Sequence, residues 1–326
     1  MNGTDHNYTD PLNVSAAVII ILLVIIGMFS NISIIYIFIR SPPERTSFNI
    51  ICVFRAISNI VILSWAFLAT FVPITLIGHS PFSKFYETIV IAISNTLYSG
   101  IQNTGVYIAL NRFCAMYLPL YYSKLFGFKV TFLITTLMFT YRLVKITFEC
   151  IHFIGLECWM TFTAVELAWS PTMDDKCNED SNSSSEINTS AIFLLVMTSL
   201  NIATFAKIYF FYKATDLDLK ERKKKQKKNQ ALFLQTIIQD TITLVDMIFT
   251  FRLSLLSNQR VWTFFCGTVI WGCVHSFDGV IMVMFNERLT FLKKTFFGSS
   301  PNNSIGLPVS KPAVSVAPSG FPSRVD

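Results

Sequence analysis

Charged residues are scarce in this sequence, and their scarcity excludes an ordinary soluble domain. Asp, Glu, Lys and Arg together make up 14% of the 326 residues, whereas hydrophobic residues make up 52% and Phe alone occurs 31 times. A soluble fold could not hide so much apolar surface. The expected solvent for this chain is therefore a lipid bilayer.

Residues typical of catalytic and cofactor sites are also missing. The chain has only four His, no His-x-x-x-His pair and no Gly-rich phosphate loop, which argues against metal-dependent hydrolysis and nucleotide chemistry. The last apolar stretch contains no Lys that could form a retinal Schiff base. We therefore expect no enzyme activity, no metal and no cofactor.

What the sequence does contain is a series of long apolar stretches. An odd number of membrane crossings places the two termini on opposite sides of the bilayer. We expect an all-α bundle of seven transmembrane helices at residues 15–39, 48–72, 87–112, 130–154, 190–212, 231–256 and 261–285. Around this domain of residues 15–297 we expect an extracellular segment 1–14, a short amphipathic interfacial helix after the last span, and a disordered cytoplasmic tail 298–326.

The distribution of Lys and Arg predicts the orientation. With the N-terminus outside, the extracellular segments hold 3 of these residues and the cytoplasmic segments hold 18, the other five lying within spans. The positive-inside rule thus favours an extracellular N-terminus. Five Asn-x-Ser/Thr sequons fall in segments that this orientation places outside, and we expect glycans on Asn2, Asn7, Asn13, Asn182 and Asn188.

Three of the seven cysteines lie at the end of the fourth span and in the loop after it: Cys150, Cys158 and Cys177. An oxidising compartment outside the cell would allow a disulfide there. We favour a Cys158–Cys177 bond, and pairing through Cys150 or three free thiols are the alternatives.

Several strings of residues, taken in order along the chain, resemble the nematode serpentine receptor class X chemoreceptors. They are Asn111 to Met116 with Pro119 and Tyr121, Trp262 to Phe265, Trp271, His275 to Gly279, and Phe285-Asn286. In the second extracellular loop Cys158, Trp169, Pro171 and Cys177 extend the resemblance, which covers nearly the whole membrane part. It implies a G-protein-coupled receptor for environmental chemicals, in the plasma membrane of sensory neurons.

The sequence also departs from related patterns. Arg55 occupies a position in the second span where the Srx resemblance leads us to expect His. Asn201 occupies a position in the fifth span where the resemblance makes an acid common. Compared with rhodopsin-like receptors, Asp-Arg-Tyr is represented by Asn111-Arg112-Phe113, and no Asn-Pro-x-x-Tyr closes the last span. The usual acid beside the arginine is therefore missing, and we expect a weaker resting lock.

The cytoplasmic side carries the residues that we expect to couple to a G protein. Arg112 lies where the third span reaches the headgroups, where it can hold a closed bundle and then meet a partner, although a snorkelling anchor would look the same. Seven basic residues between 220 and 228 join two spans, so they serve orientation and anionic lipid rather than nucleic acid. The expected coupling residues are Asn111, Arg112, Phe113, Pro119 and Lys224.

Polar residues within the spans predict two further sites. Asn31, Arg55, Asn59 and Asp278 share a depth of roughly 10–16 Å from the cytoplasmic ends at the helical rise, so Arg55 is expected to neutralise Asp278 in a polar core. Nearer the outside, several cations favour an anionic or hydrogen-bonding ligand, with mutual pairing such as Lys145 with Glu149 as the alternative. The expected ligand-pocket residues are Tyr98, Gln102, Arg142, Lys145, Glu149, Asp246, Arg252, Trp271 and His275.

The expected partners are therefore a small-molecule ligand, a heterotrimeric G protein and the bilayer. A seven-span ligand-gated channel or transporter is the alternative from another class, and a receptor for an internal peptide or metabolite is the alternative within the same class. A channel or transporter is expected to show repeats or a pore-lining polar stripe, and neither is evident in the sequence.

Overall fold

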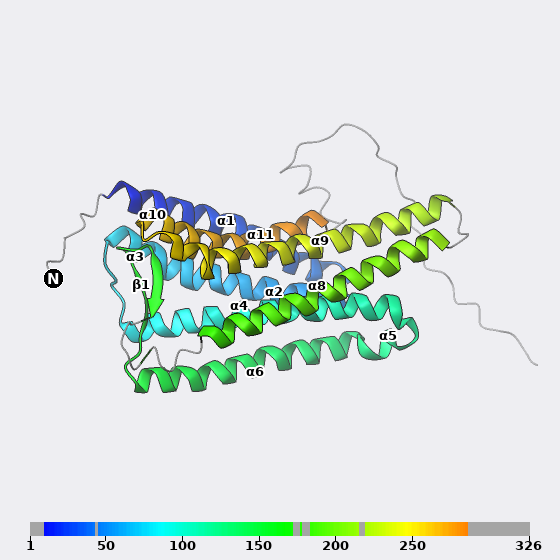
Figure 1. The fold of residues 1–326 in the computed structure, drawn as a ribbon, viewed down its shortest axis with the longest axis horizontal. Coiled ribbons are helices and arrows are strands. Elements are labelled where there is room, and N and C mark those ends of the chain that lie inside the picture. Colours follow the sequence, from blue (N-terminus) through cyan, green and yellow to red (C-terminus); the bar gives the residue numbers. More distant parts are fainter. Residues whose placement is uncertain (1–9, 43–44, 172–176, 178–182, 215–218, 286–326) are drawn as a thin grey trace, which may run out of the picture. The chain divides into compact units, whose positions relative to one another are not determined.

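The computed structural model describes residues 10–42, 45–171, 177, 183–214 and 219–285, without the side chains of 183–190 and 211–232. The described residues belong to one compact unit. Within it, helices and one β-hairpin follow in the order α1 (Pro11–Arg40), α2 (Ser47–Val61), η2 (Ile62–Phe71), α3 (Val72–Ile77), α4 (Lys84–Tyr117), α5 (Pro119–Leu125), α6 (Phe128–Gly155), β1 (Met160–Thr163), β2 (Ala168–Pro171), α8 (Ser183–Ala214), α9 (Leu219–Phe251), η3 (Leu253–Leu256), α10 (Arg260–Thr263), η4 (Phe264–Val269) and α11 (Ile270–Phe285) (Figure 1).

These elements make seven long helical rods, one for each expected span. The second rod runs through α2, the π-helical stretch η2 and α3, and the seventh runs through α10, the π-helical stretch η4 and α11. Three rods start at least four residues earlier than expected: α1 begins at Pro11, α8 at Ser183 and α9 at Leu219. The expected interfacial helix and tail lie outside the described residues.

Side-chain caps explain where several rods begin. The amide of Leu12 donates to the Asp10 carboxylate at 3.0 Å, and Thr46 and Ser83 hydroxyls accept from the first turns of α2 and α4 in the same way. The second rod ends at Gly78, whose φ of 83° is the left-handed conformation that glycine adopts without strain. Local sequence thus contributes to these boundaries.

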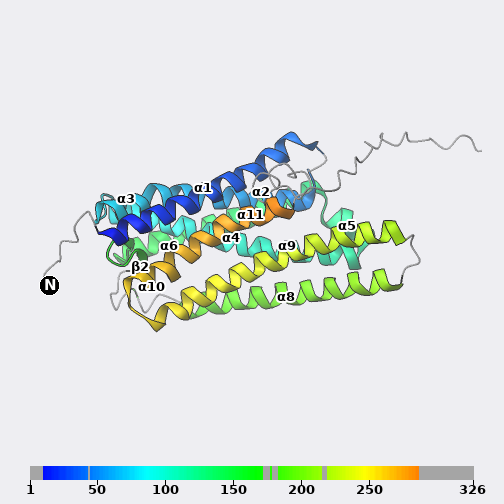
Figure 2. The ribbon, with the colours of Figure 1, turned by 90° about the horizontal axis from the view of Figure 1, so that it is seen from above.

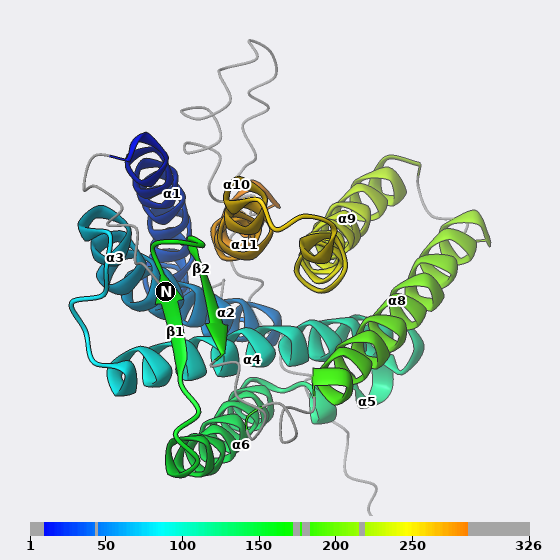
Figure 3. The ribbon, with the colours of Figure 1, turned by 60° about the vertical axis from the view of Figure 1, so that its left-hand side comes forward.

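Five of the rods are long and apolar enough to cross a membrane by composition: those at 11–40, 47–77, 128–155, 191–210 and 260–285. The other two rods, α4 and α9, carry more polar residues. α4 packs against α2, α6 and α8, and α9 against α8 and α11, so their polar side chains can face protein rather than lipid (Figures 2 and 3). By contrast, only 11% of the most apolar 18-residue stretch of α6 is buried inside the protein, and the remainder of that stretch can contact lipid.

Two glycines let α1 and α11 approach closely. A Cβ on Gly279 would lie 2.6 Å from both the Asn31 amide nitrogen and the Ser30 hydroxyl, and one on Gly27 would meet Leu63 and Ser276. Small residues at such contacts are the usual means of close helix packing in membranes. This approach brings the polar side chains of α1 within hydrogen-bonding distance of α11.

The β-hairpin closes over one end of the bundle, the end where α1 begins (Figure 1). We call this the hairpin end, and the opposite end, where α4 meets α5, the Arg112 end. Phe162 of β1 stacks on Phe71 of η2 with ring centroids 4.2 Å apart, and Leu167 in the turn is fully buried. The hairpin is therefore part of the main apolar core.

Candidate functional site

The centre of the bundle holds an ion pair between two helices. Arg55 on α2 donates from Nε and Nη2 to the two carboxylate oxygens of Asp278 on α11, at 3.2 and 2.5 Å. The side chains are only 6% and 5% exposed. Such a pair is bidentate and desolvated, so removing one partner would leave a buried charge.

Asp278 is also the acceptor for two amides. Asn59 of α2 donates to Oδ2 at 2.9 Å, and Gln239 of α9 donates to Oδ1 at 2.7 Å. The sequence interpretation missed Gln239, although a polar residue within an apolar span was a signal for it. Through this amide the polar core reaches the sixth rod as well as the second and seventh.

Asn31 ties the first rod to the same network. Its amide nitrogen donates to the backbone oxygens of His275 and Gly27 at 3.2 and 2.8 Å, and its oxygen accepts from Asn59 at 3.2 Å. The structure therefore brings together all four residues expected in the polar core, Asn31, Arg55, Asn59 and Asp278, and adds Gln239. A change in any of these rods must alter the shared hydrogen bonds.

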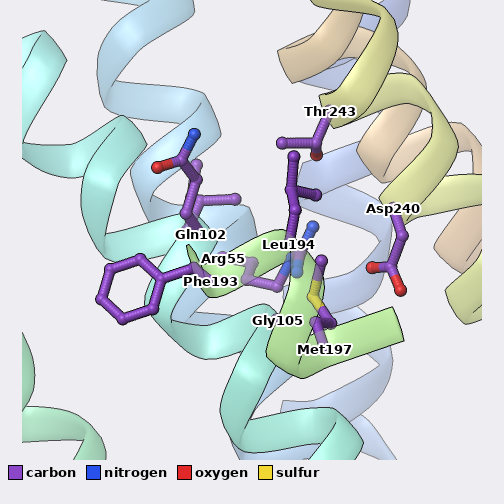
Figure 4. Close-up of a pocket in the computed structure, with 9 residues that line it drawn as sticks. Arg55, Gln102, Gly105, Phe193, Leu194, Met197, Asp240 and Thr243 are labelled. Carbon is purple, nitrogen blue, oxygen red and sulfur yellow. The ribbon is translucent and has the colours of Figure 1, made fainter. Parts of the chain in front are cut away.

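Beside the core lies a cavity of about 20 Å³, room for little more than one water molecule. Its polar wall is formed by Arg55, Gln102, Asp240 and Thr243, and its apolar wall by Ile101, Gly105, Phe193, Leu194 and Met197 (Figure 4). Asp240 accepts a hydrogen bond from Asn201 of α8 at 2.7 Å. Position 201, where an acid is common, holds Asn in this chain, and the acid Asp240 lies opposite it on α9.

Toward the hairpin end, four of the expected ligand residues meet between α4, α9 and α11. The hydroxyl of Tyr98 donates to Asp246 at 2.5 Å. The Tyr98 ring is edge-on to His275 with centroids 5.8 Å apart, and His275 is likewise edge-on to Trp271 at 5.7 Å. A fifth expected residue, Gln102, lines the cavity one helical turn from Tyr98.

The other four expected ligand residues do not reach this place. Lys145 and Glu149 pair with each other at 3.2 Å on an open face of α6, with side chains 47% and 38% exposed. Arg142 contacts the side-chain amide of Asn103 at the α4–α6 interface, and Arg252 is exposed after the end of α9. The expected preference for an anionic ligand therefore loses its basis.

At the other end of α4, Arg112 joins three rods. Its Nη1 donates to the hydroxyl of Thr236 on α9, and its guanidinium lies 5.1 Å from the ring centroid of Phe48 on α2. The neighbouring Asn111 is buried and accepts from the hydroxyl of Tyr122 on α5 at 3.4 Å. These contacts hold α4 against α9, α2 and α5 in the described conformation.

The remaining coupling candidates lie around the same end. Phe113 stacks on Tyr117 with centroids 4.4 Å apart, and Pro119 is the exposed first residue of α5. Lys224 belongs to the first turns of α9, and its side chain lies outside the described part of the chain.

At the hairpin end, buried polar contacts latch the hairpin onto the helices. Glu87 of α4 is 1% exposed and accepts from the backbone amide of Phe162 at 2.8 Å and from the hydroxyl of Ser80 at 2.5 Å. Thr268 of η4 donates to the backbone oxygen of Leu167 at 2.6 Å. A glutamate at the start of a span indicates a buried polar contact at that end of the bundle, but the sequence interpretation did not use Glu87 in this way.

A disulfide joins Cys158, just before β1, to Cys177, with Cα atoms 5.7 Å apart. Cys150 is a free cysteine, so the pairing through it does not occur in the described structure.

One expected glycan does not fit the structure. Asn13 lies within α1, is 1% exposed, and its oxygen accepts from Arg260, which also pairs with Asp10. In the described conformation the Asn13 side chain has no room for a sugar, which disfavours the expected glycan at this position. The side chains of Asn2, Asn7, Asn182 and Asn188 lie outside the described residues.

Comparison with known proteins agrees with this architecture. The model of the family described as "Serpentine type 7TM GPCR chemoreceptor Srx" matches residues 21–286. Serpentine receptor class X 45 of Caenorhabditis elegans is 24% identical over 299 residues, which cover 84% of this chain and 79% of the relative. The resemblance inferred from the sequence strings is thereby confirmed, and the chain belongs to the Srx family of serpentine seven-transmembrane chemoreceptors.

Proposed function

We propose that this chain is a chemosensory receptor of the plasma membrane that detects a small molecule and signals to a heterotrimeric G protein. In this proposal the N-terminus and the hairpin end face outside, as the split of 18 to 3 basic residues favours. The ligand binds between α4, α9 and α11, and the G protein binds at the Arg112 end.

The observation that carries the proposal is the contact of Arg112 with Thr236. It fastens α4 to α9 at the end where a G protein would have to enter, so we take the described conformation as the closed one. A hydrogen bond to a charged group is worth about 1.5–3 kcal/mol, enough to shift a two-state equilibrium by about one to two orders of magnitude. Opening the bundle must break this contact and free Arg112 for a partner.

The ligand can drive this opening only through a higher affinity for the open state. A continuous set of contacts is available for it, because Asp246 and Thr236 lie on the same helix, α9, and Gln239 between them binds Asp278. A ligand that moves α9 near Asp246 would therefore act on both the polar core and the Arg112 contact.

The proposal is tested by expressing the receptor in reporter cells, with and without a promiscuous G protein. The reporter signal is measured after exposure to odorants, metabolites and peptides. Once an agonist is found, Arg112→Ala should abolish most of the signal and leave agonist binding without G protein unchanged. Arg142→Ala is the matched control, because Arg142 contacts Asn103 at the α4–α6 interface and should leave coupling intact. A ligand-gated current that persists without G-protein signalling and ignores Arg112→Ala would instead indicate a channel.

A further inference from the structure

Asp246 is a buried acid without a basic partner in the described part of the chain. It is 4% exposed, and its carboxylate accepts from two neutral hydroxyls, those of Tyr98 at 2.5 Å and Thr250 at 3.4 Å. Asp278 differs, since it has Arg55. A carboxylate within a membrane bundle is costly unless a cation compensates it. A positively charged ligand could therefore compensate the negative charge of Asp246.

His275 offers an unused acceptor beside the same tyrosine. Its Nδ1 lies 2.9 Å from the amide oxygen of Asn59, whose nitrogen already donates to Asn31 and Asp278. Nδ1 must therefore carry the proton, which leaves Nε2 as a bare acceptor on the ring edge turned away from Asn59. His275 is fully buried, and Nε2 has no partner among the described residues.

Two aromatic rings lie against the His275 ring. Tyr98 and Trp271 both lie edge-on to the His275 ring, with centroids 5.8 and 5.7 Å away. Aromatic faces attract ammonium groups, and the attraction is strongest where water is excluded. A carboxylate, a bare imidazole nitrogen and aromatic rings together favour a cation that carries N–H donors.

We propose that Asp246, Tyr98, His275 and Trp271 form an amine site that takes the protonated amino group of a small ligand. The ammonium supplies the charge that Asp246 lacks and donates a second hydrogen bond to Nε2 of His275. This inference rests on the proposed function in one respect, that the ligand is received between α4, α9 and α11. It reverses the anionic preference that the in-span cations favoured.

The rest of the ligand has a direction in which to extend. Gln102 and Thr243 lie one helical turn from Tyr98 and Asp246, and both line the cavity of about 20 Å³. The cavity in the described structure is too small for an amine with a carbon chain of several atoms, so binding of such an amine must widen it. Its far wall is Leu194 and Met197 of α8, and the thioether of Met197 is a flexible side chain that can give way. Widening therefore moves α8 away from α4 and α9.

The test is thermal unfolding of the purified full-length receptor in nanodiscs, without G protein. The probes are butylamine and phenethylamine at millimolar concentration, each compared with the alcohol and the carboxylate of the same carbon skeleton. A ligand that binds only the folded state raises Tm. We expect at least one amine to raise Tm by several degrees, and the matching alcohol and carboxylate to have no effect.

Two variants with opposite expected effects keep the test independent of folding defects. Asp246→Asn should weaken amine binding at least about tenfold, because it removes the charged acceptor. Tyr98→Phe should strengthen it, because it removes the hydroxyl that competes for the carboxylate. Glu149→Gln is the matched control: it removes an acid that pairs with Lys145 on the open face of α6, and it should leave the selectivity for amines over alcohols unchanged.

Several outcomes would overturn the amine site. They are stabilisation by alcohols equal to that by amines, a preference for carboxylates, no effect of Asp246→Asn on amine binding, or no stabilisation by either amine. Because the measurement contains no G protein, a failure of coupling would not affect it. A neutral or anionic agonist that signals through Arg112 would overturn the amine site and leave the proposed receptor function standing.

Discussion

Arg55 and Asp278 face each other across the α2–α11 interface with two hydrogen bonds, at 3.2 and 2.5 Å, and almost no exposure. The pair is the centre of a network to which four of the seven rods contribute, through Asn31, Asn59 and Gln239. A network with so many shared acceptors has few alternative arrangements, so it can hold the bundle in discrete states.

The first prediction concerns the energetic coupling of this pair. Arg55→Ala and Asp278→Asn should each destabilise the receptor by about 3–5 kcal/mol, because each leaves its partner buried and uncompensated. The double variant should cost much less than the sum. Thermal unfolding of the four proteins in detergent measures the cycle.

The control cycle pairs Arg55→Ala with Asp246→Asn, since Asp246 hydrogen-bonds Tyr98 and Thr250 instead of Arg55. That cycle should be close to additive. Additivity in the Arg55–Asp278 cycle as well would mean that the buried contact does not contribute as argued.

The second prediction concerns the resting lock. Thr236→Val keeps the shape of the side chain and removes the hydroxyl that accepts from Arg112. The closed state should lose about 1.5–3 kcal/mol, so basal signalling should rise about tenfold or more. Basal second-messenger levels, normalised to surface expression, measure the effect.

Thr241→Val is the control, because Thr241 is exposed on the same helix and its hydroxyl donates to the backbone oxygen of Ile237 within α9. Arg112→Ala should not raise basal signalling, since the same residue is needed for coupling. Unchanged basal signalling in Thr236→Val, at normal expression, would contradict the lock.

The third prediction concerns the disulfide that anchors the hairpin. Cys158 and Cys177 are 19 positions apart, and closing a loop of this size contributes about 3 kcal/mol in the chain-entropy model. Cys158→Ala and Cys177→Ala should therefore lower surface expression to a similar degree. Cys150→Ala is the control, because this cysteine is free. A double variant that is no worse than either single one would complete the argument, whereas two free thiols in peptides from the unreduced receptor would refute it.

The fourth prediction concerns the latch at Glu87. Glu87→Ala leaves the buried amide of Phe162 and the hydroxyl of Ser80 without their acceptor, which should cost about 1–3 kcal/mol. The loss should appear as faster hydrogen exchange across β1 and β2, with exchange in the centre of α11 unchanged. Equal acceleration throughout the bundle would mean that Glu87 stabilises the whole fold rather than the hairpin.

The level of Arg55 and Asp278 along the helix axes was predictable from the sequence, and the rotation of α6 about its own axis was not. Counting residues from the helix ends placed Arg55 and Asp278 at one level, and the structure pairs them. The same counting placed Lys145 near the expected ligand pocket, but α6 turns that side chain outward. Rotation depends on which face packs, and α6 has so little buried surface that its sequence carries a weak signal for it.

The hairpin was missed for a related reason. Its strands are only four residues long, and they become stable by packing Phe162 onto Phe71 and by the Glu87 contact rather than by their own pattern. The hydrophobic pattern of so short a segment does not distinguish a strand from a loop. Asn13 is a similar case, because a sequon does not reveal that Arg260, far along the chain, will bind its side chain.

The last prediction concerns topology. If the N-terminus is outside, an N-terminal epitope tag should stain on living cells without permeabilisation, and glycosidase treatment should shift the receptor to a lower apparent mass. Replacing Asn2, Asn7, Asn182 and Asn188 together by Gln should abolish the shift.

Asn13→Gln alone should leave the glycosidase shift unchanged, because the native side chain is sealed against Arg260. It should instead lower stability, since the longer side chain disturbs the contact that holds α1 to α10. Staining that appears only after permeabilisation, in cells with the receptor proven at the surface, would reverse the orientation and move the G-protein contact away from Arg112.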